Sequence, residues 1–286
     1  MTRQERWVPY LFLAPALLLI IAFRFFPAIA GLRESFYGVS FMSDTGKVFV
    51  GLENFINIFK DKTFVQSIRV TVLFNLIVNP LQILLALALA VLVNQRVRGV
   101  TGFRSVLLLP VAVSLSVSAI IGGMAMDRAG LLNGLLSFFG LPPQPFLLSS
   151  RTALASIIGL SSWIGCPFWM LFILAGMQSI PSDIYESASM DGANAWVKFT
   201  NITLPLLRRT LAFVLVSDTV SNFLLFVPVF ILTSGGPELS TSTIMYEAYR
   251  RGLVYGDIGA SSAMVSVLLF IIMIVIAVEF YFIRSE

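Results

Sequence analysis

The chain holds few of the side chains on which enzymes rely. It has no histidine and one cysteine, Cys166, so Ser-His-Asp and Cys-His catalysis, histidine-ligated zinc and an internal disulfide are excluded. None of its four lysines stands in a Gly-x-x-x-x-Gly-Lys phosphate-binding loop. Cys166 lies in the apolar run 163–168, which indicates a buried, inert thiol. We therefore predict that the chain is not an enzyme, holds no metal and binds no cofactor of its own.

Polar side chains inside apolar stretches are the remaining candidates for a site. Asn75, Asn79 and Gln82 follow the spacing i, i+4, i+7, and Asp218 and Asn222 are four residues apart, so each set shares one helical face. Polar groups are costly to place in lipid and often mark a solute pathway. They also join helices to one another, and the spacing leaves that alternative open. The candidate pathway residues are Asn75, Asn79, Gln82, Ser114, Ser118, Trp163, Asp218 and Asn222.

Membrane-spanning helices are the elements that must position these residues. Hydrophobic residues make up 57% of the chain and charged residues only 12%, about half the share of a soluble domain. About 20 apolar residues suffice to cross a bilayer. Six stretches qualify: 9–31, 69–93, 104–126, 152–178, 209–232 and 260–282. The first resembles a signal peptide in its basic start but is longer than one, so we interpret it as a retained helix. The sequence therefore predicts an all-α, polytopic membrane protein whose residues 1–286 form one domain.

The segment between the fourth and fifth stretches is too patterned for a simple connector. Pro181–Asp183 are helix-start signals, and Gly192 is a helix stop because glycine tolerates a left-handed backbone. Residues 193–201 can form a second short helix, which we expect Leu204-Pro205 to break before the basic pair Arg208-Arg209. The loop 180–208 therefore presents a compact exposed helix that suits a cleft in another protein.

The spacing Glu-x-Ala-x-x-x-Gly, nine residues, then Ile-x-Leu-Pro resembles the EAA loop of ABC importer permeases. The matching positions are Glu186, Ala188, Gly192, Ile202, Leu204 and Pro205. Ser187 departs from the motif, but serine is nearly as small as the expected alanine. In that family the first short helix is the coupling helix, which sits in a cleft of the ATPase subunit. The resemblance assigns ATPase coupling to seven residues: Tyr185, Glu186, Ala188, Asp191, Gly192, Leu204 and Pro205.

Further segments resemble the maltose and glycerol-3-phosphate branch of the same family. These are Ala14-Pro15-Ala16, Phe26-Pro27, Gly51–Phe55 and Thr233–Pro237, and they are most similar to the first of two unlike permeases. The resemblance implies a type I importer fold in the bacterial inner membrane, with both termini cytoplasmic. It also implies a second, non-identical permease, two ATPase subunits that bind ATP and Mg, and an external solute-binding protein. A sugar-like solute, on which Trp163 can stack, would cross by alternating access.

Charge counting alone does not decide the orientation. If both termini lie in the cytoplasm, nine Lys/Arg residues fall on the cytoplasmic side of the membrane and nine on the outer side. The short loop 94–104, whose charges are all positive, favours the inside, and the mixed-charge stretch 32–68 suits the outside. A secondary transporter or channel is the main alternative, which would show inverted repeats that we do not find. An intramembrane aspartyl enzyme would need two facing acids, and Asp218 has only Glu279 as a weak partner.

Overall fold

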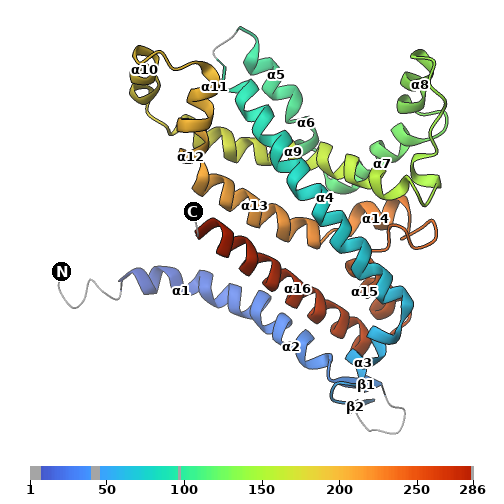
Figure 1. The fold of residues 1–286 in the computed structure, drawn as a ribbon. Coiled ribbons are helices and arrows are strands. Elements are labelled where there is room, and N and C mark those ends of the chain that lie inside the picture. Colours follow the sequence, from blue (N-terminus) through green and yellow to red (C-terminus); the bar gives the residue numbers. More distant parts are fainter. Residues whose placement is uncertain (1–7, 40–45, 96–97, 285–286) are drawn as a thin grey trace. The chain divides into compact units, whose positions relative to one another are not determined.

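The structure, a computed structural model, describes residues 8–39, 46–95 and 98–284, and these residues are mostly helical (Figure 1). This confirms the predicted all-α class. Six helical stretches are long and apolar enough to cross a membrane: Tyr10–Glu34, Lys62–Val93, Leu115–Phe138, Ala153–Gln178, Arg208–Leu232 and Ile258–Phe282. The contacts divide the chain into two compact units, and each is described by itself. The single permease domain remains a prediction.

The first unit contains residues 1–65 and 247–270. Its first span consists of helices α1 (Val8–Ile20) and α2 (Phe26–Glu34), which are joined by the π-helical turn η1 (Ile21–Phe25). A two-stranded antiparallel hairpin follows, β1 (Tyr37–Val39) with β2 (Lys47–Phe49), in which Gly38 pairs with Val48. Helix α3 (Glu53–Lys60) lies next to the hairpin, because the side chain of Asn54 donates 2.9 Å hydrogen bonds to the carbonyl oxygens of Ser35 and Tyr37.

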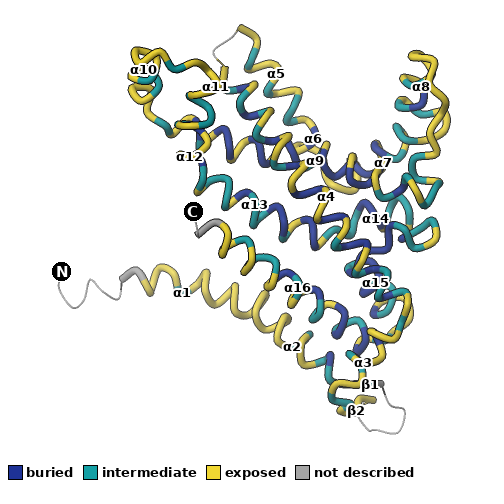
Figure 2. The backbone as a smooth tube through the Cα atoms, viewed as in Figure 1, coloured by how far each residue is buried: buried dark blue, intermediate teal, exposed yellow. Residues whose placement is uncertain are grey.

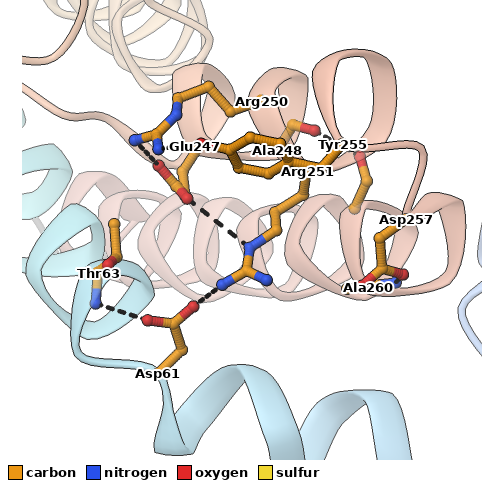
Figure 3. Close-up of polar contacts among 10 residues, drawn as sticks. Asp61, Thr63, Glu247, Ala248, Arg250, Arg251, Tyr255, Asp257 and Ala260 are labelled. Atoms are coloured by element: carbon orange, nitrogen blue, oxygen red, sulfur yellow. Dashed lines mark hydrogen bonds and ion pairs between the residues drawn. The ribbon is translucent and has the colours of Figure 1, made fainter.

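An ion network connects the two sequence segments of this unit (Figure 3). Glu247 is 1% exposed and accepts a 3.1 Å hydrogen bond from Arg250. Arg251 forms ion pairs with both Glu247 and Asp61, and the other Asp61 oxygen accepts from the backbone N–H of Thr63 at 2.9 Å. Burial raises the pKa of the Glu247 carboxyl above its ordinary value, and the charge of Arg250 partly offsets that rise.

The second unit contains residues 66–246 and 271–286. Its long helices are α4 (Lys62–Val93), α9 (Ala153–Gln178), α13 (Arg208–Phe223) and the second half of α16 (Ile258–Arg284). Shorter elements are α5 (Val100–Leu107), α6 (Leu109–Ala112), α7 (Leu115–Met126), α8 (Leu131–Phe138), the 3₁₀ turn η2 (Phe146–Leu148), α14 (Val227–Leu232) and the start of α15 (Ile244–Tyr249). The end of α15 and the π turn η4 (Arg250–Val254) belong to the first unit. In one core cluster, Ala90 of α4, Ile173 of α9 and Val214 of α13 pack together.

Two of the predicted spans are interrupted. The stretch 104–126 was expected to form one helix, but the backbone is extended at Val113 and Ser114, and α7 begins after Ser114. Pro110 lies at the start of α6, and the Ser114 side chain caps α7 by accepting from the Val117 N–H at 3.4 Å. The stretch 209–232 likewise divides into α13 and α14, with Pro228 in the first turn of α14.

Burial differs between the spans (Figure 2). None of the first span's apolar window is buried, whereas 61% of the window in α9 is. In the first span the exposed side chains include Phe12, Phe23 and Phe26. A contiguous apolar surface of this size is stable only against lipid or another protein. The first span therefore requires such a cover in the assembled protein.

Candidate functional site

The loop between α9 and α13 begins with helix α10 (Ser182–Met190), which carries the motif residues Glu186 and Ala188. The helix starts after Pro181 and has Asp183 in its first turn, as predicted. It ends at Gly192, which has φ +79°. The N–H of Gly192 donates to the carbonyl of Ser189 at 3.1 Å, and that of Ala193 to Ala188 at 2.9 Å. This is the Schellman helix end that the glycine predicted.

The second half of the loop is helical throughout, which corrects the prediction that Leu204-Pro205 breaks it. Helix α11 (Ala195–Lys198) continues into the π turn η3 (Phe199–Thr203) and then α12 (Leu204–Leu206). Pro205 falls in the first turn of α12, where its missing N–H is not needed. Leu207 keeps right-handed helical angles before α13 starts at Arg208. The backbone is therefore helical from α11 into the span that carries Asp218.

Two side-chain hydrogen bonds fasten α10 to the following helical segment. The hydroxyl groups of Tyr185 and Thr203 are 2.9 Å apart, and Thr203 is buried. Lys198 donates from Nζ to Oγ of Ser189 at 2.6 Å. Asn194 caps α11 by accepting from the N–H of Val197 at 2.9 Å. These contacts hold the loop in one folded unit from α10 to α12, residues 182–206, which is called the knob below.

The outer surface of this knob is unusually apolar for a polar loop. Met190 is 85% exposed and Trp196 is 70% exposed. Glu186 and Asp191 are exposed beside them, and Glu186 has no ion pair with any of the described residues. Large exposed apolar side chains with charged neighbours are typical of a protein-binding surface. The loop therefore has the surface expected of a docking site, in addition to the motif.

A second candidate site is a buried polar cluster in the second unit. The amide of Asn222 donates to Oδ1 of Asn79 at 2.8 Å, to Oε1 of Gln82 at 3.1 Å and to Oδ1 of Asp218 at 3.0 Å. Asn79 in turn donates to the hydroxyl of Thr219 at 3.0 Å. The structure therefore brings together four of the residues that helical spacing singled out, from α4 and α13.

This cluster borders a cavity of about 390 Å³ in the second unit. Gln82, Asp218 and Asn222 line it together with Ser221 and Trp169. The Asp218 side chain is 1% exposed, and its carboxyl group interacts with the Trp169 side chain as well as with Asn222. A pocket of this size with a few convergent polar groups among apolar walls is suited to a small polar ligand.

The other predicted pathway residues lie apart from the cavity. Asn75 is buried, but its amide donates to the carbonyl of Thr71 in its own helix at 2.8 Å. Ser114 caps α7, and Ser118 is buried without lining the cavity. Trp163 is half-exposed on α9, and it borders two other hollows.

The predicted set omitted three residues of the cluster. Trp169, rather than Trp163, lines the cavity beside Asp218. Thr219 joins Asn79 to α16 by donating from its hydroxyl to Oε1 of Glu279 at 2.7 Å. The sequence indicated Glu279 only as a weak partner of Asp218, although an acidic residue inside the apolar run 260–282 is costly unless partnered.

Comparisons with known proteins identify the family. Residues 82–285 match the model described as binding-protein-dependent transport system inner membrane component. The chain is 33% identical to the sn-glycerol-3-phosphate transport system permease protein UgpA of Agrobacterium fabrum, covering 98% of this chain and 95% of that protein. The UgpA of Escherichia coli O157:H7 is also 33% identical, over 99% of this chain and 96% of that protein.

Solved structures show the same fold. A chain in the crystal structure of a bacterial alginate ABC transporter, in complex with an alginate pentasaccharide-bound periplasmic protein, has a TM-score of 0.83 at 22% identity, over 96% of this chain and 93% of its own. A second, from a transporter that imports the acidic polysaccharide alginate, has a TM-score of 0.79 at 23% identity, over 99% and 96%. The chain therefore belongs to the family of binding-protein-dependent transport system inner membrane components and is the membrane-spanning permease subunit of an ABC importer.

Proposed function

We propose that this chain carries a sugar or sugar-like polar solute across the bacterial inner membrane. In this proposal it pairs with a second, non-identical permease, and the pair works with two ATPase subunits and an external solute-binding protein. ATP and Mg²⁺ are held by the ATPase subunits, because no lysine of this chain stands in a phosphate-binding loop. Both termini and the loop 180–208 face the cytoplasm.

The observation that carries the proposal is the continuous helical backbone between the exposed knob and the buried cluster. Helix α10 is fastened to η3 through Tyr185 and Thr203, and the helical backbone then runs through α12 into α13. A displacement of α10 by a closing ATPase would therefore move Asp218 and Asn222 with α13. Such a push shifts the transporter between states only if the ATPase binds one state more tightly.

The same proposal assigns the solute pathway to the cavity lined by Gln82, Asp218 and Asn222. Their acceptor oxygens and the Trp169 ring are the groups that bind hydroxyl-rich solutes. Asn79 acts behind them, because its oxygen accepts from Asn222. Asn75, Ser114, Ser118 and Trp163 would border other stretches of the path in other states of the transporter.

The test changes single residues of the knob, by reversing a charge or by adding a side chain. Glu186→Lys reverses an exposed charge, and Gly192→Asn adds a side chain at a position where asparagine tolerates the left-handed backbone. An added Cβ at Gly192 meets no atom within 4 Å, so the fold should persist. We expect both variants to lose at least tenfold in ATP hydrolysis by the purified transporter, while remaining in the membrane.

Glu53→Lys is the matched control, because it reverses an exposed carboxylate on α3, outside the loop. It should leave the hydrolysis rate within about twofold. Co-purification of an ATPase with the wild-type chain is also expected. Transport driven by an ion gradient alone, with normal activity in both loop variants, would establish the secondary-transporter alternative instead.

A further inference from the structure

We propose that the cavity beside Asp218 rejects anionic solutes, so that the transported solute is a neutral or cationic sugar or polyol and not a phosphate ester or uronate. The inference rests on the proposed function, because it takes this cavity as part of the solute pathway. It separates the chain from its relatives, whose names specify glycerol 3-phosphate and whose structural neighbour imports an acidic polysaccharide.

The first argument is the charge of the cavity wall. Asp218 accepts a hydrogen bond at Oδ1, while its buried Oδ2 accepts none of good geometry from the described residues. Behind it, Glu279 accepts from Thr219 at Oε1, and its buried Oε2 is likewise without a hydrogen bond among those residues. Among the fifteen described residues that line the cavity, none is lysine or arginine. An anion entering here would face the acidic side chain of Asp218 without any compensating cation from the residues that line the cavity.

The second argument is the direction of the hydrogen bonds. The Asn222 amide is used by three protein acceptors, Asn79, Gln82 and Asp218. Gln82 also donates from Nε2 to the carbonyl of Ser161 at 2.8 Å. The donors of these amides are therefore directed at protein atoms. The Asp218 carboxyl, which lines the cavity beside Trp169, presents an acceptor oxygen to the solute. Hydroxyl and ammonium groups donate to such an oxygen, whereas ionised phosphates and carboxylates have no proton to donate.

The experiment measures the charge preference of the cavity directly. In the complete transporter, in lipid nanodiscs at pH 8, Ser221→Cys places a thiol on the cavity wall, and Cys166→Ser removes the one native cysteine. The hydroxyl of Ser221 donates to the carbonyl of Ser217 in its own helix at 2.9 Å, so the fold should tolerate the change. The probes are anionic sulfonatoethyl and cationic trimethylammonioethyl methanethiosulfonate. Intact-mass spectrometry of this chain follows the labelling.

We expect the cationic reagent to react at least tenfold faster than the anionic one, after normalisation to Phe138→Cys on the exposed helix α8. Asp218→Asn should reduce that ratio to within about twofold of unity, and Asp218→Glu should preserve it. An equal ratio in the Ser221→Cys, Cys166→Ser transporter with and without Asp218→Asn would overturn the proposal. So would a thiol at position 221 that neither reagent labels, because the cavity would then admit no water-soluble solute.

A second measurement addresses the solute itself. The transporter is expressed in cells whose other glycerol 3-phosphate uptake systems are deleted. These cells should take up no more labelled glycerol 3-phosphate than the same strain without the transporter, and greater uptake would overturn the proposal. The labelling ratio does not require ATP. Loss of ATP-driven transport with an intact ratio would therefore refute the proposed function, while transport with a flat ratio would refute only charge rejection.

Discussion

At the scale of single residues, the amide of Gln82 depends on a glycine in the facing helix. A Cβ added at Gly165 of α9 would lie 2.8 Å from Nε2 of Gln82 and 3.1 Å from its Cδ. Gly165→Ala should therefore displace the amide from Ser161 and Asn222 and leave buried polar groups unpaired. We expect a loss of about 1–3 kcal/mol in the free energy of unfolding, measured by thermal unfolding of the purified protein.

Gly159 is the matched control, because it lies in the same helix and an added Cβ there meets no atom within 4 Å. Gly159→Ala should leave stability unchanged or raise it by up to about 1 kcal/mol, since alanine favours helix over glycine. Equal losses for the two alanine variants would show that close packing at Gln82 is not responsible.

Glu247 should give the first unit a pH dependence of known sign. Burial raises the pKa of this carboxyl above its ordinary value of 4.5, so the folded chain holds the proton more tightly than the unfolded chain. Between those two pKa values the folded state binds more protons, and stability falls as the pH rises. Relative to Glu247→Gln, the wild type should lose melting temperature as the pH rises above 4.5.

The ion pair between Arg251 and Asp61 should contribute to stability independently of the pH trend that Glu247 causes. Asp61→Asn removes the other acidic partner of Arg251 but leaves Glu247 in place, so it should lower stability without abolishing the pH trend. The melting temperature of the wild type minus that of Glu247→Gln should fall as the pH rises. If this value stayed constant or rose with pH, the inferred direction of the pKa shift would be wrong.

At the scale of elements, hydropathy indicated six spans but not their interruptions, and the third span, Leu115–Phe138, begins and ends later in the chain than the predicted 104–126. The breaks at Val113–Ser114 and before Pro228 lie in stretches that stay apolar, so composition carries no trace of them. Proline itself proved a poor guide to where a helix ends. Phe26-Pro27 and Leu204-Pro205 each follow a π turn, which lets the helix restart with proline in its first turn. Gly192 was predictable because its requirement for positive φ is local.

The link between α10 and η3 is the element-level contact on which coupling should depend. Tyr185→Phe removes the hydroxyl that contacts Thr203 and keeps the ring. We expect the variant to keep its ATPase partner but to use more ATP per solute moved, because α10 could then shift without moving α13. The measurement is the ratio of ATP hydrolysis to uptake in proteoliposomes. It should rise about threefold, although the lost hydrogen bond is worth only about 1 kcal/mol.

Thr203→Val and the double variant provide the control for that prediction. If the two hydroxyl groups act through each other, the double variant should resemble either single one. Additive effects would indicate that Tyr185 contacts the ATPase directly and does not act by holding α10.

At the scale of the whole molecule, sequence patterns predicted helical faces well and long-range partners poorly. The buried positions of Asn75, Asn79 and Gln82 follow from one helical period. The pairing of Thr219 with Glu279 spans 60 residues, and that of Asp61 with Arg251 spans 190. No local rule connects such distant positions, so only the folded chain reveals the division into two units and the composition of the polar cluster.

The orientation of the protein in the membrane can be tested at the two ends of the second unit. Helices α10 and α8 lie at opposite ends of α9 (Figure 1). If the coupling loop faces the cytoplasm, α8 must face outside. Met190 of α10 and Phe138 of α8 are both more than 80% exposed, so a cysteine at either position should be reached by reagents on its own side. The native Cys166 is buried, and its replacement by serine leaves a clean background.

A membrane-impermeant maleimide added to intact spheroplasts should therefore label Phe138→Cys and leave Met190→Cys unlabelled. In inside-out vesicles the result should reverse, because the cytoplasmic face is then accessible. Labelling of Met190→Cys in intact spheroplasts, with Phe138→Cys protected, would place the loop 180–208 outside. An ATPase in the cytoplasm could not then contact α10, so this one comparison decides whether the exposed knob is in a position to receive the energy of ATP.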